Sequence, residues 1–488
     1  MSLDDKRLKV LFVGSEVAPY AKSGGLGDVI AALPKALARL SIDARVVFPK
    51  YQSIKLEYLE GSQYIDSFNV KLGWRSQNAS IFQMSDEITG NVPTYMIENS
   101  YYFGRDGFYG YGDDFERFAF FSKASIEFLS LIDFKPDVIH FNDWQTALGP
   151  LYLKDYYKRY RFFSNIKTLF TIHNIQYQGM FGSEILGMID LNSGYFTGDK
   201  LEFYGKVNYL KSGIVYSDAI STVSETYARE IQTHSYSYGM DGVLRSRAAD
   251  LYGIINGIDT DMYNPETDKN LTSNYNADSA DKKNDNKLAL QRRLNLPERA
   301  DVPMFAVISR LADQKGFDLI AFVMDELMAR DIQLVVLGTG DSRYEHLFWR
   351  LAEQYPDKLS ANILFNEELA RQIYASADIF LMPSLFEPCG LGQIISMRYG
   401  TIPVVRKTGG LSDTVSHFDK DDPESTGNGF LFEDYLASGL MWAINRATDC
   451  FYDKESWRRV VQNAMHGDFS WPSSAEKYIE LYEKLGDR

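Results

Sequence analysis

Cysteine and long apolar runs are both scarce in this sequence. Its 488 residues contain two cysteines, Cys389 and Cys450, which lie far apart and outside any zinc-binding spacing. Such scarcity favours a reducing compartment over a disulfide-stabilised secreted domain. No apolar run reaches the roughly 20 residues that a membrane-spanning helix needs. The polar start, residues 1–7, lacks the hydrophobic core of a signal peptide. We therefore expect a cytoplasmic protein with no membrane partner.

Positive charge is the second scarce feature. Lysine and arginine number 51 against 66 aspartates and glutamates, which gives a formal net charge of −15. Because nucleic-acid binding needs a basic face that neutralises phosphates, we expect no nucleic-acid partner. An anionic small molecule can bind such a chain only where cationic side chains and backbone amides create a local positive site. The sequence predicts no metal site and no cofactor, and it carries no signal for an oligomeric state.

The length and composition predict two ordinary globular domains. Hydrophobic residues make up 45% of the chain and charged residues 24%, which is typical of globular proteins, and one hydrophobic core rarely supports a chain this long. In the first half, apolar strands alternate with helices, so we expect a mostly parallel sheet covered on both faces. The predicted strands are 8–13, 44–48, 137–140, 168–171 and 219–223. The predicted helices are 28–40, 115–131 and 147–160, and Pro34 is expected to kink or shorten the first of them.

A composition break separates this half from a second one. Residues 264–287 are rich in Asn, Asp, Ser and Lys and predict a solvated linker or surface insertion. Further predicted strands follow at 304–308, 334–337, 379–382 and 402–405. We therefore predict an α/β protein with two doubly wound domains joined near residues 255–300. Ligands of such sheets lie beyond the carboxyl ends of the strands, so a ligand is expected in the cleft between the domains.

The first candidate binding segment is Lys22 to Asp28, directly after the first strand. Its glycines let a ligand approach the backbone, and a helix start offers unpaired amides to an anion. Lys22 adds a positive charge. The alternative is a tight turn in which Asp28 caps the helix. A dinucleotide fingerprint fits less well, because the glycines do not fall as G-x-G-x-x-G and no acidic residue ends the second strand.

Two cations follow the first strand of the second half. Arg310 offers a planar fork of donors that suits phosphate, and Lys315 supplies a compact charge. On a loop between strand and helix they could grip a diphosphate. The alternative is a solvated loop whose charges have no function.

A third segment, residues 383–393, also connects a strand to a helix. Glu387 is placed to accept hydrogen bonds from sugar hydroxyls, and Gly390 and Leu391 can offer backbone amides. Thr408, Gly409 and Gly410 follow the next strand and could cradle phosphate. Alternatively, Glu387 merely caps the following helix. Cys389 is more often a small buried residue than a nucleophile, since no His/Asp partner lies near it.

The fourth segment, residues 171–179, holds His173 and Asn174 at the end of another strand. A lone histidine is more often structural than functional. Asp143 lies at a neighbouring strand end and could hold a sugar hydroxyl or orient a neighbour. Glycosidase chemistry would need two close carboxylates, for which Asp143 and Glu387 are the candidates.

Taken together, these segments closely resemble the glycogen/starch synthase family, glycosyltransferase family 5, over nearly the whole chain. The order of the segments is that of the family, and several are long and unusual. The segments that carry the resemblance are 22–28, 102–103 with 109–110, 143–144, 171–179, 238–240, 256–259, 309–316, 337–340, 387–391, 407–411 and 469–471.

The resemblance implies the B-type glycosyltransferase fold, with two Rossmann-like domains and the active site in the interdomain cleft. The implied division is an acceptor-side domain at 1–255, a linker and insertion at 256–300 and a nucleotide-sugar-binding domain at 301–468. The final segment, 469–488, is expected to be a helix that packs back on the first domain.

The resemblance also implies roles for single residues. Lys22 matches the donor-binding lysine, with Gly24 and Gly25 beside it, and Arg310 and Lys315 match the pair that binds the diphosphate. Glu387 matches the essential glutamate beside the donor glucose. His173 matches a histidine that uses its backbone carbonyl near the anomeric centre and its side chain on a hydroxyl. The implied sugar-pocket and backbone contacts are Asp143, Asn174, Asn256, Gly390, Leu391, Thr408, Gly409 and Gly410.

Two positions depart from the family pattern. Gly392 stands where many relatives carry Thr or Ile, and Asn142 stands where relatives often have His. The first change bears on helix entry, and the second bears on contacts to the acceptor. Neither removes a catalytic group.

The implied activity is glucosyl transfer from ADP-glucose to the non-reducing 4-hydroxyl end of an α-1,4-glucan, with retention of configuration and without a metal. ADP-glucose is the donor favoured by the bacterial and plant branch of the family. The alternatives are a retaining glycosyltransferase that uses UDP-glucose or a small acceptor, a sugar-nucleotide epimerase and a non-catalytic glucan-binding protein. A pure binder has no need for a diphosphate grip.

Overall fold

The computed structural model describes residues 7–487 and divides into two compact units. The first unit contains the chain up to Val223, Ala228–Ile254 and the chain from Trp471 onward; the second contains Ser224–Tyr227 and Ile255–Ser470. We expected no signal peptide because the first seven residues are polar. Residues 1–6 lie outside the described residues. Within residues 7–487, no helix combines the length and apolar character that crossing a bilayer requires.

The first unit is built on one mixed sheet. Among the described residues it has nine strands in the order β12-β11-β7-β6-β1-β2-β5-β4-β3. Strands β12 to β5 in that order run parallel, and β4 and β3 add an antiparallel edge. The bounds are β1 (Lys9–Val13), β2 (Asp43–Pro49), β3 (Gln63–Leu72), β4 (Arg75–Gln83), β5 (Thr94–Glu98), β6 (Val138–Asn142), β7 (Lys167–Ile172), β11 (Ala219–Thr222) and β12 (Leu251–Gly253).

The predicted central strands of this sheet are confirmed, and the antiparallel edge was not predicted. Parallel strands covered on both faces are continuously apolar, as in β1, where Val10 to Val13 are fully buried. Strand β3 is mostly exposed and polar, so it gives no such signal.

The helices up to residue 246 are α1 (Gly25–Arg39), α2 (Leu56–Leu59), α3 (Asp86–Thr89), α4 (Ser100–Phe103), α5 (Asp114–Glu127), α6 (Gly149–Tyr152), α7 (Tyr209–Tyr216), α8 (Glu225–Glu230) and α9 (Asp241–Ser246). Helix α1 continues through Pro34 to Arg39, so the expected shortening is wrong. Its buried face packs on β2 and on α18 (Trp471–Gly486), which holds the helix together past the proline. The helix predicted over 147–160 is instead broken into α6 and a π-helical turn.

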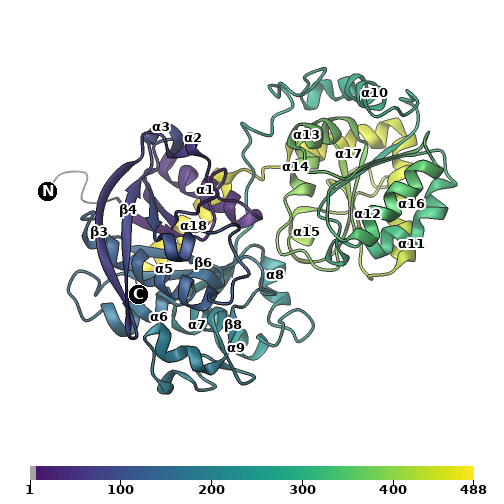
Figure 1. Cartoon of the computed structure of the whole chain (residues 1–488). Helices are drawn as coiled ribbons and strands as arrows, with labels where there is room; N and C mark the ends of the chain where they lie inside the picture. Colours follow the sequence, from purple (N-terminus) through teal and green to yellow (C-terminus); the bar gives the residue numbers. More distant parts are fainter. Residues whose placement is uncertain (1–6, 488) are drawn as a thin grey trace. The chain divides into compact units, whose positions relative to one another are not determined.

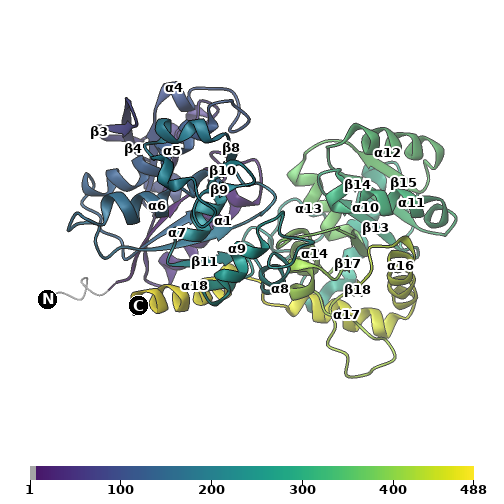
Figure 2. The same cartoon turned by 90° about the horizontal axis from the view of Figure 1, so that it is seen from below.

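The last helix, α18, belongs to the first unit. Figure 1 shows it in yellow among the purple and blue elements of that unit. Buried aromatic residues fix it there: the Tyr482 hydroxyl lies 2.8 Å from Nδ1 of His140 in β6. A small second sheet of this unit pairs β8 (Met180–Phe181), β10 (Lys206–Asn208) and β9 (Glu202–Phe203), which lie side by side in Figure 2.

The second unit is a doubly wound parallel sheet. Its six strands within the described residues follow the order β15-β14-β13-β16-β17-β18. Their bounds are β13 (Met304–Ile308), β14 (Gln333–Leu337), β15 (Leu359–Asn362), β16 (Ile379–Met382), β17 (Ile402–Arg406) and β18 (Phe430–Phe432). The helices are α10 (Lys283–Arg293), α11 (Phe317–Met328), α12 (Ser342–Gln354), α13 (Glu367–Ser376), α14 (Gly392–Arg398), α15 (Gly409–Thr414), α16 (Ala437–Tyr452) and α17 (Lys454–His466).

The polar segment 264–287 lies within the second unit, so of the two predicted alternatives it fits a surface insertion and not a linker between the units. It leads into α10, which packs against α13 in the second unit (Figure 1). The ammonium group of Lys283 is buried and donates to the carbonyls of Tyr374, Ala375 and Tyr399. Lys287 forms a buried ion pair of 2.7 Å with Asp378. Both lysines are therefore buried, beside the rings of Tyr275 and Phe451, because backbone carbonyls and a carboxylate satisfy their ammonium groups.

Each sheet has one point at which the strand order reverses direction. In the first unit it lies between β1 and β6, and in the second between β13 and β16. Ligands of doubly wound sheets bind beyond the strand ends at such switch points. The loops that follow these four strands, with their neighbours, carry the residues described next.

Candidate active site

A buried carboxylate organises the loop after β1. Glu16 is 4% exposed. Its oxygens accept hydrogen bonds from the Ser23 amide (2.5 Å), the Ser23 hydroxyl (2.6 Å) and the Gly24 amide (3.1 Å). The Tyr109 hydroxyl donates to the same carboxylate at 2.6 Å. Glu16 therefore fixes the conformation of the segment that leads into α1.

The glycines of this segment serve neither a turn nor tight packing. Neither Gly24 nor Gly25 has a positive φ, and a Cβ built at either position would meet no atom within 4 Å. Both are exposed at the start of the 15-residue helix α1. What the missing side chains provide is open access to the first backbone amides of that helix, which attract anions.

Lys22 lies beside these amides, but its charge is partly neutralised. Its ammonium group pairs with Asp28 at 2.8 Å, and both side chains are about one-third exposed. Asp28 is therefore a first-turn residue and an ion-pair partner, and Gly24 occupies the N-cap position that the alternative had given to Asp28.

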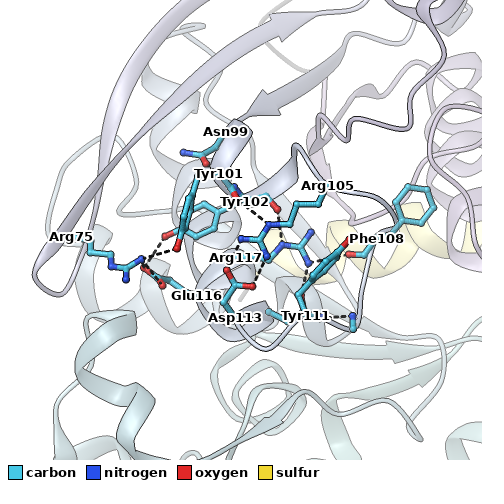
Figure 3. Close-up of polar contacts among 12 residues, drawn as sticks. Arg75, Asn99, Tyr101, Tyr102, Arg105, Phe108, Tyr111, Asp113, Glu116 and Arg117 are labelled. Carbon is cyan, nitrogen blue, oxygen red and sulfur yellow. Dashed lines mark hydrogen bonds and ion pairs between the residues drawn. The ribbon is translucent and has the colours of Figure 1, made fainter.

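The loop between α4 and α5 presents Tyr109 to Glu16. Two arginines fix this loop, as Figure 3 shows. Arg105 makes a bidentate pair with Asp113 at 2.6 and 2.7 Å. Arg117, which is fully buried, pairs with Asp114 and donates to the carbonyls of Tyr102 and Phe108. These charges hold the loop in place.

The strand ends of β6 and β7 bring Asp143 and His173 together. The Asp143 carboxylate accepts the His173 amide at 2.8 Å. Burial raises the pKa of Asp143 to about 7 and the Glu16 carboxylate adds to this, whereas the amides of His173 and Asn174 oppose it. Burial lowers the pKa of His173 to about 3, so its imidazole is neutral at physiological pH.

The hydrogen bonds of Asn142 select the tautomer of His173. The Asn142 amide nitrogen donates to the carbonyls of Val13 and His140, so its oxygen is the atom that faces Nε2 of His173 at 2.9 Å. Nε2 must then carry the proton, which leaves Nδ1 as an acceptor. The departure from the family pattern at Asn142 thus has a structural role.

In the second unit, the loops after β13 and β16 meet through an ion pair. Lys315 lies 2.6 Å from Oε2 of Glu387, with side-chain exposures of 19% and 7%. The Ser384 hydroxyl also donates to Oε2 at 3.2 Å. No described residue donates to the other oxygen, Oε1. One oxygen of a buried glutamate is therefore available to a substrate.

Arg310 lies on the same loop and is exposed. Its guanidinium contacts Gln314 at 3.3 Å, and no carboxylate of residues 7–487 pairs with it. The loop packs closely on its neighbour: a Cβ at Gly316 would lie 2.1 Å from the carbonyl oxygen of Pro383. An unpaired arginine beside the Lys315–Glu387 pair gives this edge of the sheet a positive character.

The loop after β17 differs from the prediction at Gly410. Its amide donates to the carbonyls of Glu387 and Pro388 at 3.0 and 3.1 Å, so it supports the neighbouring loop instead of offering itself to phosphate. A Cβ at Gly409 would lie 2.0 Å from the carbonyl oxygen of Glu387, so this glycine permits the close approach of the two loops. Thr408 is buried at the start of α15.

Three further predicted residues lie in the second unit. Asn256 is buried, and its side-chain oxygen has no hydrogen-bond partner among the described residues. Gly390 and Leu391 are partly exposed at the start of α14. Burial raises the pKa of the Cys389 thiol to about 12, so it is not a nucleophile at neutral pH.

The predicted residues thus form two sets, one in each unit. The first-unit cluster contains Lys22, Gly24, Gly25, Asp143, His173 and Asn174; the second-unit cluster contains Asn256, Arg310, Lys315, Glu387, Gly390 and Leu391, with Thr408 to Gly410 as support. Asp143 and Glu387 belong to different units. Glu16 and Tyr109 were not predicted as site residues; the position of Glu16 just beyond β1 was the available signal.

Comparisons with known proteins agree across the chain. A family model described as the starch synthase catalytic domain matches residues 9–246, and one described as glycosyl transferases group 1 matches residues 291–465. The glycogen synthase of Clostridium acetobutylicum is 50% identical, covering 97% of this chain and 99% of its own. That of Geobacillus stearothermophilus is 49% identical and covers 98% of both chains.

Solved structures support the same architecture. The catalytic domain of starch synthase IV from Arabidopsis thaliana, bound to ADP and acarbose, has a TM-score of 0.91 at 36% identity, covering 99% of this chain and 100% of that chain. This likeness confirms the predicted B-type glycosyltransferase fold. Sucrose-phosphate synthase from Thermosynechococcus elongatus has a TM-score of 0.61 at 17% identity, covering 98% of this chain and 99% of its own, a likeness that shows the fold alone.

Proposed function

This chain belongs to the glycogen and starch synthase family of glycosyltransferases, and we propose that it transfers glucose from ADP-glucose to the non-reducing 4-hydroxyl end of an α-1,4-glucan with retention of configuration. Membership confirms the resemblance found in the sequence, and activity as a glycogen (starch) synthase follows from it. The donor, the stereochemistry and the roles of single residues belong to the proposal.

The observation that carries the proposal is the Lys315–Glu387 pair beside Arg310. A diphosphate leaving group gains negative charge as the bond to the anomeric carbon breaks. Cations already held in place stabilise this charge without reorganising, which is the largest single contribution in many enzymes. Lys315 is held by Glu387 at 2.6 Å, and Arg310 has no competing carboxylate among the described residues.

Glu387 and the first-unit cluster have complementary roles in this proposal. Oε1 of Glu387 accepts a hydrogen bond from a hydroxyl of the donor glucose, while Oε2 keeps Lys315 in place. The carbonyl oxygen of His173 accepts no hydrogen bond from residues 7–487, so it is available to stabilise positive charge at the anomeric carbon. Nδ1 of its neutral imidazole accepts a hydrogen bond from a sugar hydroxyl.

The loop of Lys22 to Gly25 contributes backbone amides and one cation to the donor. These amides are those at the start of α1. Glu16 accepts the amides of Ser23 and Gly24 and thereby fixes the segment that leads into this helix. A chain of net charge −15 thereby binds an anion through local groups, in line with the requirement set by its composition.

The test is incorporation of labelled glucose into glycogen with ADP-glucose or UDP-glucose, with EDTA present throughout. We expect transfer from ADP-glucose to survive chelation and to exceed transfer from UDP-glucose. Polymer formed from UDP-glucose alone would contradict the donor assignment. Absence of polymer from either donor, with or without added metal, would contradict the acceptor.

A further inference from the structure

Two Tyr-Gly turns in the first unit have an unusual backbone. Tyr204 and Gly205 join β9 to β10, with φ of 48° and 77°. Two-residue hairpin loops with positive φ at both positions normally contain Asn-Gly, because a bulky side chain is disfavoured there. Tyr238 and Gly239 repeat the pattern with φ of 49° and 87°. The tyrosines are therefore poor choices for the turns that they occupy.

Burial does not compensate for this strain. Tyr204 is 83% exposed and Tyr238 is 45% exposed. The Tyr204 ring packs edge-on against Phe203, with ring centroids 4.7 Å apart, yet most of it stays exposed. Non-glycine residues held in left-handed conformations cluster at active sites and ligand-binding surfaces, so these exposed rings are candidates for binding a ligand.

The two turns lie against each other. A Cβ at Gly239 would lie 3.1 Å from the ring of Phe203 and 3.2 Å from the ring of Tyr204. The Gln178 side chain donates to the carbonyl of Tyr238 at 3.1 Å. The strand that contains Met180, just beyond Gln178, pairs with β10 in the sheet seen in Figure 2.

A third exposed tyrosine joins this group and connects it to the active-site loop. Tyr177 is 51% exposed. Tyr177 directly precedes Gln178, whose side chain donates to the carbonyl of Tyr238 at 3.1 Å, so the two tyrosines lie on adjoining segments. The Tyr177 amide donates to the carbonyl of Asn174 at 3.2 Å, so the ring follows directly on the His173–Asn174 turn.

We propose that Tyr177, Tyr204 and Tyr238 form an acceptor platform on which glucose units of the α-1,4-glucan stack. This inference rests on the proposed function, since it names where its acceptor binds. A glucose ring has apolar C–H faces and hydroxyls at its rim, so it matches a ring that is apolar on its face and polar at its hydroxyl. Three neutral rings beside a sugar-binding loop suit a neutral, repeating ligand.

The decisive variant is Tyr204→Asn. It removes the ring and installs Asn-Gly, the sequence that this turn prefers, so the melting temperature should stay the same or rise. If the platform binds glucan, the KM for maltoheptaose should rise about three- to tenfold, the range expected for one aromatic contact. The KM for the donor and kcat at saturating acceptor should stay within about twofold. Tyr204→Trp should restore affinity.

Binding is also read without catalysis, by retardation of the native protein in gels that contain glycogen. Tyr204→Asn and Tyr238→Asn should be retarded less than wild type. Tyr160→Asn is the matched control, because Tyr160 is 52% exposed in the same unit and lies outside the platform.

Two results would overturn the platform. The first is unchanged retardation and unchanged acceptor KM in both variants. The second is a lowered melting temperature together with a lowered kcat. Failure of the proposed function gives a different signature. Wild type would then transfer no glucose to glucan, while its retardation by glycogen would still report on the platform.

Discussion

The two clusters of predicted site residues treat charge in opposite ways. In the first unit, Lys22 is paired with Asp28, His173 is neutral, and burial raises the pKa of Asp143 to about 7. In the second unit, Arg310 has no carboxylate partner among the described residues, and Lys315 lies 2.6 Å from the buried Glu387 carboxylate. In our proposal Asp143 and His173 of the first cluster serve hydroxyl groups, and Arg310 and Lys315 of the second serve a charged leaving group.

The buried ion pairs show the same division. Arg117 and Asp114 in the first unit maintain a loop. Lys315 and Glu387 in the second unit join the loops after β13 and β16, where we propose that the donor binds. Similar pairs therefore have different purposes, and burial alone does not distinguish them. The variants below separate structural charge from catalytic charge.

The largest effect is expected on the stability of the first unit. Arg117→Met leaves the Asp114 carboxylate buried without its partner, and breaking a buried pair costs about 3–5 kcal/mol. Chemical denaturation should show this loss. Arg292→Ala, which breaks an exposed pair with Glu298, should change stability by less than about 1 kcal/mol. Equal effects of the two variants would remove the distinction between structural and surface charge.

Lys315→Ala should act on turnover instead. Removal of one preorganised donor typically lowers kcat about 10²–10³-fold. Retardation in gels that contain glycogen should not change, because we assign Lys315 to the donor and not to the glucan. Steady-state kinetics with ADP-glucose measures the first quantity, and Arg292→Ala is again the control. Turnover equal to that of wild type would refute the assigned role of Lys315.

Glu16→Gln should show that donor binding by the first cluster depends on the segment that Glu16 holds in position. A glutamine can still accept the amides of Ser23 and Gly24 through its carbonyl oxygen, but its NH2 group then replaces the oxygen that accepts the Ser23 and Tyr109 hydroxyls, and the negative charge is lost. Hydrogen bonds to charged groups contribute about 1.5–3 kcal/mol, so kcat/KM for the donor should fall about 10- to 100-fold. Glu16→Asp should recover part of it. A fall in glucan affinity alone would contradict this role.

Much of this division could be predicted from the sequence. Strands such as β1 and β13 were found because buried parallel strands are continuously apolar, and Lys315 and Glu387 were found because they follow such strands. Their pairing across the chain was not predictable, since no local pattern encodes it. Glu16 was missed although it lies just beyond β1, because no local pattern shows that a carboxylate accepts backbone amides.

The burial of Lys283 and Lys287 was missed for a different reason. Lys283 and Lys287 look like solvent-exposed residues, yet backbone carbonyls of α13 and α14 and the Asp378 carboxylate satisfy them. Burial even lowers the pKa of Lys283 to about 7. Composition reports the absence of apolar side chains, but it does not report the presence of polar partners.

The smallest effect tests whether the first cluster is kept near neutrality. Because burial raises the pKa of Asp143 from its ordinary value of 3.8 to about 7, the folded state holds a proton between these values that the unfolded state has lost. The stability contributed by the protonated group is fully present below the unfolded pKa and is lost as pH rises through the folded one. Asp143→Asn cannot lose a proton.

The difference in unfolding free energy, variant minus wild type, should therefore increase by about 1–3 kcal/mol from pH 5 to pH 8. Comparing each protein with itself across pH cancels the constant effect of the new amide. Glu298→Gln, at an exposed surface pair, should show no such trend. A difference that does not change with pH would mean that Asp143 is ionised throughout. The first cluster would then carry a permanent negative charge, which other groups would have to offset before an anionic donor could bind.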